Sequence, residues 1–355
     1  MKALIERHWY RPRPWLGVLL APLEALFAAL SGLRRLAFRR GLGRVDALPV
    51  PVVVIGNVNV GGVGKTPLTL ALLASLAERG VTAGVISRGY GGSANVPTPV
   101  ARDSDPALVG DEPLLLAQAG APVWVGRDRV AAGRALLAAH PQVQLILSDD
   151  GLQHYRLARD VEIVVLDGAR GLGNGRLLPN GPLREPASRL ASVDALVING
   201  PPDAALLNKL PAAPARFSMR LAPQRFVSLA EPALTRTAAD FAGLRVVALA
   251  GIGHPQRFFA TLRALGLAVS REIAFPDHHA FSAADLPEDA DAIVVTAKDA
   301  VKLQCVNHVK LWVLPVTGVV EPDLADWLLA KLKLPYGRKI SRHSGVPGVQ
   351  GPAGV

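Results

Sequence analysis

The stretch that decides the fold is Pro51-Val-Val-Val-Ile-Gly56, followed by Asn57-Val-Asn-Val-Gly-Gly-Val-Gly-Lys-Thr66. Its apolar half is continuous rather than alternating, which is typical of a strand buried on both faces of a parallel sheet. Residues 67–79 read as a helix, and Pro67 suits the first turn because a proline there needs no N–H partner. A strand, a glycine-rich loop and a helix in this order predict an α/β fold of the P-loop NTPase type, with a mostly parallel sheet flanked by helices.

The glycine-rich loop is expected to bind the phosphates of ATP. In such loops, backbone N–H groups and the helix N-terminus point at the phosphates, a lysine reaches the β and γ phosphates, and the next hydroxyl binds Mg²⁺. The predicted phosphate-binding residues are Asn59, Gly61, Gly62, Val63, Gly64, Lys65 and Thr66, with Thr66 also on the metal. Asn59 departs from the usual pattern, which has glycine there, but asparagine tolerates positive φ better than most residues. The alternative, a chance glycine-rich turn, leaves the flanking strand and helix unexplained.

A second apolar run, residues 143–148, ends at Asp149-Asp150. In open α/β sheets, ligands bind at the carboxyl ends of the strands, where Asp149 would lie. Asp149 is therefore predicted to hold the magnesium or its water shell. The alternative is that both residues merely cap a turn.

Further motifs separate a kinase from other P-loop proteins. They are Ser87–Gly92 (SRGYGG), Gly110–Pro113 (GDEP), Asp149–His154 (DDGLQH), Asn180–Pro186 (NGPLREP), Gly251–Phe259 (GIGHPQRFF), Phe275–His279 (FPDHH) and Thr296–Lys302 (TAKDAVK). Together with the phosphate loop, and in this order, they resemble the tetraacyldisaccharide 4′-kinase family, which phosphorylates the lipid A precursor on the inner face of the Gram-negative inner membrane. The resemblance runs from about Tyr10 to Leu334.

The resemblance implies roles for particular residues. Asp111 and His278 would act together as the base that accepts the proton of the sugar hydroxyl, although the motif alone does not decide between His278 and His279. Glu112 and Asp149 would bind Mg²⁺. Expected contacts with the substrate or the transferring phosphate are Arg88, Tyr90, Arg129, Asp150, Gln153, His154 and Arg184. Without the family pattern, Asp111 reads equally as a helix cap and His278 as a loop histidine.

The net charge of +10 lies at the two ends of the chain. Residues 1–44 carry nine Lys or Arg and two Glu, and residues 331–355 carry five cations and no acid, which leaves −2 for the rest. No aromatic residues interleave with these cations as base-stacking requires, so nucleic acid is not an expected partner. The single cysteine, Cys305, excludes a disulfide framework.

The segment Trp15–Leu30 is apolar except for Glu24 and is flanked by arginines. It is short for a transmembrane helix, and the glutamate, Pro22 and the following arginines do not suit a secretory signal. An interfacial helix, a spanning helix and a core helix remain open, with membrane association favoured. The expected location is the cytoplasmic face of the inner membrane, peripheral or monotopic, with a lipid-linked disaccharide as substrate and no obligate protein partner.

The chain is expected to divide into five parts. These are a membrane-associated helix region (1–44), a P-loop kinase domain (45–203), a linker with a β-hairpin (204–240), a smaller α/β domain with a closing helix (241–334) and a disordered tail (335–355). The hairpin is predicted at 216–230. If Asp111 and His278 meet, the active site lies between the two domains.

Two rival functions use the same phosphate loop. A membrane-bound partitioning ATPase typically has a second lysine before the paired glycines, where this chain has Val60, and it needs no separate base. A nucleotide sensor would bind ATP without chemistry. Dependence of ATP turnover on a sugar-lipid acceptor discriminates the kinase from both.

Overall fold

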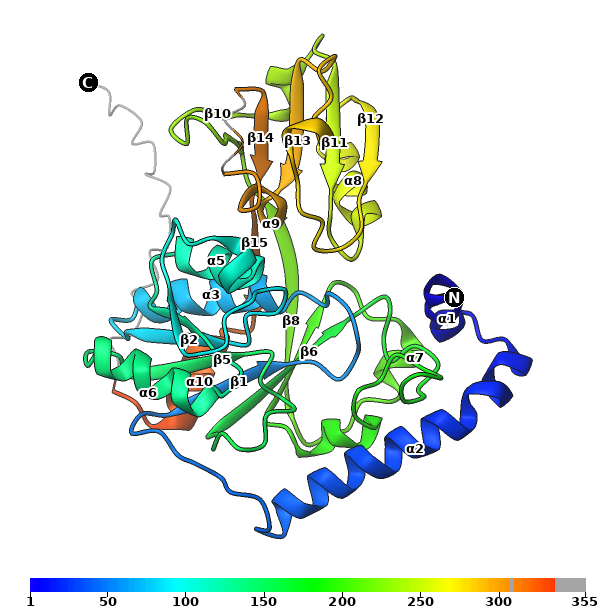
Figure 1. Ribbon diagram of the computed structural model, residues 1–355, viewed down its shortest axis with the longest axis vertical. Coiled ribbons are helices and arrows are strands. Elements are labelled where there is room, and N and C mark those ends of the chain that lie inside the picture. The colour runs from blue at the N-terminus through cyan, green and yellow to red at the C-terminus, as the bar shows by residue number, and fades with distance from the viewer. Residues whose placement is uncertain (305, 307–308, 336–355) are drawn as a thin grey trace, which may run out of the picture.

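The computed structural model describes residues 1–304, 306 and 309–335, which form two β-sheets with helices on their faces (Figure 1). The predicted tail lies outside the described residues except for Pro335. The larger sheet has nine strands in the spatial order β15 (Val316–Glu321), β8 (Ala215–Pro223), β7 (Ala195–Asn199), β6 (Val161–Asp167), β1 (Val52–Gly56), β5 (Leu145–Asp149), β2 (Ala83–Ser87), β4 (Val123–Val125) and β3 (Thr98–Val100).

All neighbouring strands of the larger sheet are parallel except β3 and β15, which are antiparallel edge strands. Strand β1 is central, and every one of its residues is buried. The predicted α/β class with a mostly parallel sheet is confirmed. The two buried strands predicted at residues 51–56 and 143–148 form within two residues of their expected positions, as β1 and β5.

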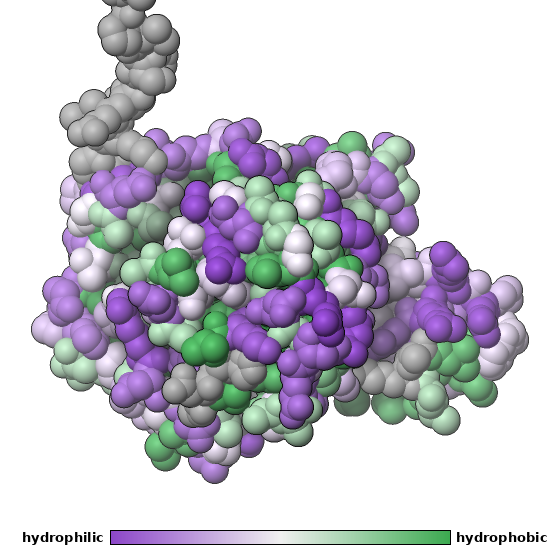
Figure 2. Space-filling model, turned by 90° about the horizontal axis from the view of Figure 1, so that it is seen from above, coloured by the Kyte–Doolittle hydropathy of each residue, from purple (hydrophilic) through white to green (hydrophobic). Residues whose placement is uncertain are grey.

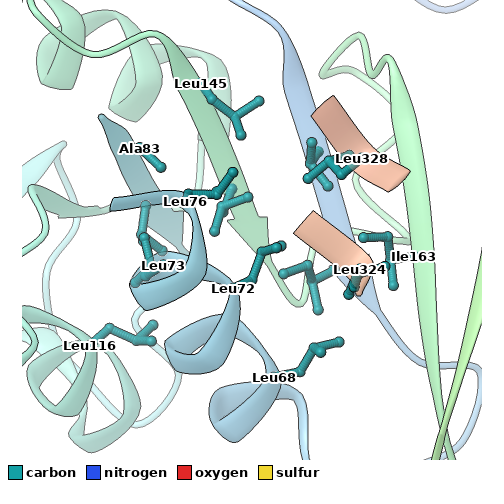
Figure 3. Packing of buried hydrophobic residues seen from close by; sticks show 14 of the residues in the cluster. Leu68, Leu72, Leu73, Leu76, Ala83, Leu116, Leu145, Ile163, Leu324 and Leu328 are labelled. Carbon is teal, nitrogen blue, oxygen red and sulfur yellow. The ribbon is translucent and has the colours of Figure 1, made fainter. Parts of the chain in front are cut away.

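Helix α3 (Lys65–Ala77) packs one face of this sheet through leucines that are almost fully buried, among them Leu68, Leu72 and Leu76. Helix α10 (Leu324–Leu332) lies beside it with Leu324 and Leu328 turned to the same core (Figure 3). The other helices of this unit are α4 (Pro106–Val109), α5 (Asp111–Gln118), α6 (Arg129–Ala139) and α7 (Ala204–Leu207), with the 3₁₀ turn η1 (Ala187–Ser192). The C-terminal helix therefore packs on the P-loop unit.

The smaller sheet has six strands in the order β10 (Thr235–Arg236), β9 (Phe226–Ser228), β14 (Leu311–Leu314), β13 (Ala292–Thr296), β11 (Val246–Ala250) and β12 (Val269–Ala274). Helix α8 (Pro255–Ala264), helix α9 (Ala297–Ala300) and the turns η2 (Ala238–Phe241) and η3 (Ala283–Asp285) complete this unit. Phenylalanines of α8 fill the core on one face of the sheet.

The predicted hairpin at 216–230 is wrong. Strand β8 pairs with β7 and β15 in the larger sheet, whereas β9 pairs with β10 and β14 in the smaller one. The chain thus passes to the smaller sheet after Pro223 and returns to the larger sheet after Leu314. The predicted assignment of residues 241–334 to the smaller domain is therefore wrong for β15 and α10, which belong to the larger unit. A pattern of apolar residues identifies strands, but it does not say which sheet each strand joins.

The N-terminal region forms α1 (Lys2–Tyr10) and α2 (Pro14–Arg39), and α2 runs along the outside of the larger unit (Figure 1). By length and composition α2 could cross a membrane, and only 11% of its most apolar window is buried. Leu16 and Leu20 face the protein, whereas most of the other large apolar side chains of α2 are exposed. The core-helix alternative is therefore wrong.

Candidate functional site

The phosphate loop connects β1 to α3 at the carboxyl edge of the larger sheet. Gly61 and Gly64 adopt φ values of +103° and +100°, which favour glycine, and Gly64 is the N-cap of α3. Asn59 is not among the described residues with positive φ, so the reason given for its tolerance in the loop is wrong. Instead its buried side chain donates to the carbonyl of Gly171 at 2.9 Å, and its own carbonyl accepts from Asn57 Nδ2 at 2.7 Å.

Lysine 65 lies in a polar network at the ends of β1 and β5. Its Nζ is 3.4 Å from both Asn57 Oδ1 and Asp150 Oδ1, and Arg184 donates to Asp150 at 3.3 Å and also to Asn57. Burial by itself would raise the pKa of Asp150, but the charges of Lys65 and Arg184 outweigh it and lower that pKa to about 2. The network holds Lys65 at the mouth of the phosphate loop, and Asn57 is a member that sequence reasoning missed.

Asp149 ends β5 beside β1 and is 1% exposed. Neither carboxylate oxygen has a hydrogen-bond partner among the described residues. Burial, followed by the nearby Glu112 carboxylate, raises the pKa of Asp149 to about 7. A buried carboxylate without a partner is costly unless a ligand satisfies it. This position therefore fits a cation.

The residues present suit Mg²⁺ bound jointly by protein and nucleotide. No group of three or more His, Cys, Asp or Glu among the described residues could hold a metal alone. Mg²⁺ commonly takes one or two carboxylates, waters and substrate phosphates. Asp149 and Glu112 supply two carboxylates and Thr66 supplies a hydroxyl, which leaves the other positions on Mg²⁺ to water and phosphate oxygens.

Asp111 belongs to the larger unit and His278 to the smaller one, and their side chains are in contact. Asp111 opens α5, and His278, with φ of +61°, lies in the loop after β12; its Nδ1 is 3.0 Å from Asp111 Oδ2 and 3.1 Å from Oδ1. Neighbouring His279 lies 3.4 Å from Asp285 and stacks on Phe275 instead. The helix cap before Asp111 is Gly110, so the capping alternative is not what the structure has.

The contact changes the proton affinity of both partners. The hydrogen bond to Asp111 raises the pKa of His278. Burial would raise the pKa of Asp111, but His278 and then Lys298 outweigh it and lower that pKa. Asp111 is therefore an ionised carboxylate at neutral pH.

Lys298 is a site residue that sequence reasoning missed. It belongs to α9 of the smaller sheet, and its Nζ lies 3.0 Å from Glu112, 3.4 Å from Asp277 and 3.8 Å from Asp111. Burial would lower the pKa of Lys298, but the charges of Glu112 and Asp111 outweigh it and raise that pKa. The only signal in the sequence was its place in the Thr296–Lys302 motif directly after an apolar strand.

The remaining predicted residues make separate contacts around the site. The ring of Tyr90 lies 5.2 Å from that of His278, and Gln153 donates to Glu185 at 2.7 Å. Arg129 is 4% exposed, and burial lowers its pKa to about 10. Burial and then the charge of Arg129 lower the pKa of His154 to about 4, so this imidazole is neutral. Arg88 is exposed at the end of β2, where its charge contributes to the lowered pKa of Arg129.

Comparisons with known proteins agree with one another. A family model described as tetraacyldisaccharide-1-P 4′-kinase matches residues 16–333. A Chromobacterium violaceum protein named tetraacyldisaccharide 4′-kinase is 67% identical over 340 residues, covering 94% of this chain and 99% of that protein. A Neisseria meningitidis serogroup C protein of the same name is 48% identical, covering 93% and 96%. The crystal structure of LpxK from Aquifex aeolicus in complex with ATP superposes with a TM-score of 0.75 at 27% identity, covering 90% of this chain and 98% of that one.

Proposed function

Because this chain belongs to the tetraacyldisaccharide-1-P 4′-kinase family, we propose that Asp111 and His278 form the base of its reaction. The reaction is transfer of the γ-phosphate of ATP to the 4′-hydroxyl of a tetraacylated glucosamine disaccharide 1-phosphate, a step of lipid A biosynthesis. The observation that carries the proposal is the 3.0 Å contact between Nδ1 of His278 and Oδ2 of Asp111, which joins α5 of the larger unit to the loop after β12 of the smaller one.

In the proposed step, the 4′-oxygen attacks the γ-phosphorus. The new O–P bond forms as the bond from the γ-phosphorus to the β,γ-bridging oxygen breaks, and ADP leaves with that oxygen. The hydroxyl proton passes to the carboxylate of Asp111, which its lowered pKa keeps ionised, and His278 orients that carboxylate. Positioning and charge stabilisation supply most of the catalysis in such reactions.

Binding of the nucleotide falls to the phosphate loop. We expect its N–H groups, the N-terminus of α3 and Lys65 to bind the ATP phosphates, with Arg184 and Asp150 holding Lys65 in place. Asp149, Thr66 and Glu112 would hold Mg²⁺, which neutralises phosphate charge when bound. The unpartnered oxygens of Asp149 support this assignment.

We also propose that α2 lies flat in the membrane interface on the cytoplasmic side, where ATP is available. Its inner face is fixed to the protein: Glu24 accepts hydrogen bonds from Asn180 at 2.7 Å, Arg176 at 3.1 Å and the backbone N–H of Leu177 at 3.0 Å. Near its other end, Phe38 contacts Tyr155 with ring centroids 5.7 Å apart. A spanning helix would have to break these contacts.

The outer face of α2 is suited to acyl chains. Exposed apolar residues recur every three or four positions, at Leu19, Leu23, Leu26, Leu30 and Leu33, so they share one face. On the face seen from above, by contrast, hydrophobic residues occur in small separate groups among hydrophilic ones (Figure 2). Docking by α2 would bring the phosphate loop to a substrate that stays in the bilayer.

The base is tested by ³²P transfer from ATP to the tetraacyldisaccharide 1-phosphate in detergent micelles. We expect Asp111→Ala and His278→Ala to lower kcat by at least about a hundredfold with little change in ATP affinity. His279→Gln is the matched control, because this neighbouring histidine contacts Asp285 instead. An equal loss in the His279 variant, or an effect on KM alone, would remove the pair from the base role.

A further inference from the structure

Arg170 lies at a junction of three parts of the chain. It follows β6 and donates hydrogen bonds to the Tyr10 hydroxyl of α1 and to Nε2 of His254, which precedes α8 of the smaller unit. Its guanidinium also lies over the Tyr10 ring, 4.7 Å from the centroid. None of the motifs used above to assign the active site contains Arg170 or Tyr10.

The guanidinium lies against the phosphate loop. A Cβ placed on Gly61 would be 3.4 Å from Nη1 and 3.5 Å from Nη2 of Arg170. The smaller unit approaches the same place, because a Cβ on Gly253 would be 4.0 Å from the backbone nitrogen of Gly62. Since the N–H groups of this loop are expected to bind the ATP phosphates, Arg170 lies beside the proposed phosphate site.

The guanidinium of Arg170 makes no ion pair with a carboxylate in the part of the chain that the structure describes. Among the described residues, no Asp or Glu lies within ion-pair distance, and the nearby Asp167 is paired with Arg257 at 2.6 Å. Both hydrogen-bond partners are uncharged at neutral pH: burial raises the pKa of Tyr10, and burial and then the charge of Arg170 lower that of His254. An uncompensated guanidinium beside a phosphate loop is suited to an anionic ligand.

We propose that Arg170 contacts the terminal phosphate of ATP and stabilises it during transfer, and that Tyr10 and His254 are positioning residues that hold Arg170 in place. This role rests on the proposed function. As the γ-phosphorus leaves the bridging oxygen for the 4′-oxygen, negative charge is shared by the transferring group and ADP, and the N–H groups of Arg170 donate to it. The proton still goes to Asp111. An arginine supplied within the same chain serves phosphoryl transfer in this way in other P-loop proteins.

The arrangement also connects Arg170 to two other parts of the chain. Tyr10 comes from the N-terminal segment, and His254 comes from the unit that carries His278 and Lys298. Arg170 therefore has both partners only when α1 and the smaller unit are seated on the phosphate loop.

The test compares Arg170→Ala, Arg170→Lys, Tyr10→Phe and His254→Ala with wild type, with Arg263→Ala on the exposed side of α8 as control. We expect Arg170→Ala to lower kcat by about a hundredfold or more, Arg170→Lys to recover part of it, and the two partner variants to lose about tenfold. Binding of ATP and of ADP is measured separately. If Arg170 contacts the terminal phosphate, Arg170→Ala weakens ATP binding and leaves ADP binding unchanged.

Three results in Arg170→Ala would overturn the proposal. They are an unchanged kcat, an equal loss of ATP and ADP binding, and a raised KM for the lipid alone. The third result would mean that Arg170 binds the 1-phosphate of the acceptor. Equal loss of both nucleotides together with a lowered unfolding temperature would make Arg170 a structural residue. If wild type itself transfers no phosphate to the disaccharide, the proposed function fails, and the contact of Arg170 with the terminal phosphate is then decided by the comparison of ATP and ADP binding.

Discussion

The flat orientation of α2 predicts how tightly the protein holds a membrane. We consider the triple change Leu23→Ser, Leu26→Ser and Leu30→Ser on the outer face, where these side chains are 54%, 57% and 61% exposed. Fully burying a leucine contributes about 1.5–3 kcal/mol, so the exposed parts of the three together represent about 3–5 kcal/mol. Because each 1.4 kcal/mol is a factor of ten, vesicle binding should weaken by roughly a hundredfold to a few thousandfold.

The assay is co-sedimentation with vesicles of anionic phospholipid, together with kinase activity on the lipid acceptor in vesicles and in detergent micelles. We expect the triple variant to leave the pellet and to lose activity on vesicles while keeping it in micelles. A matched control changes Leu108, Leu234 and Leu244 to serine, because these leucines are also exposed, at 42%, 43% and 37%, but lie elsewhere. Unchanged vesicle binding of the α2 variant, or equal release of the control, would refute the reasoning.

Other predictions concern the site and the core. Lys65→Ala should lower kcat/KM at least about a hundredfold, because its ammonium is expected on the β and γ phosphates; wild-type turnover would remove the loop from ATP binding. Removing Mg²⁺ with EDTA should abolish transfer, and Asp149→Asn should raise the Mg²⁺ concentration needed to restore it; an unaltered Mg²⁺ titration would exclude Asp149 as a ligand. Leu72→Ala, at a 2% exposed position between α3 and the sheet, should cost about 2–5 kcal/mol of stability in urea unfolding, and a cost below about 1 kcal/mol would contradict the packing described.

The sequence predicts those parts of the fold that are determined by residues close together in the chain. The buried strand before Lys65 and the turn that follows it are encoded within sixteen consecutive residues, so the phosphate loop could be read directly. The partners of β8 and β9 could not, because the choice between two sheets depends on strands far along the chain.

In the candidate site, too, contacts between residues far apart in the chain could not be predicted from local sequence. Asp111 and His278 are 167 residues apart, and only a resemblance to a family placed them together in advance. Lys298 reaches Glu112 over 186 residues, and Arg170 reaches Tyr10 over 160. The spacing of these residues along the chain does not predict such pairs, because each pair depends on how the two units and α1 pack against one another.

The double crossing between the sheets makes the smaller unit a removable insertion. Pro223, at the end of β8, is paired directly with Val316, at the start of β15. A two-residue turn in place of residues 224–315 could therefore close these strands into a hairpin without disturbing any of the nine strands or α10. The product would keep the phosphate loop, Lys65 and Asp149 but lose His278, His254 and Lys298. We therefore expect one excision to separate nucleotide binding from phosphoryl transfer within a single chain.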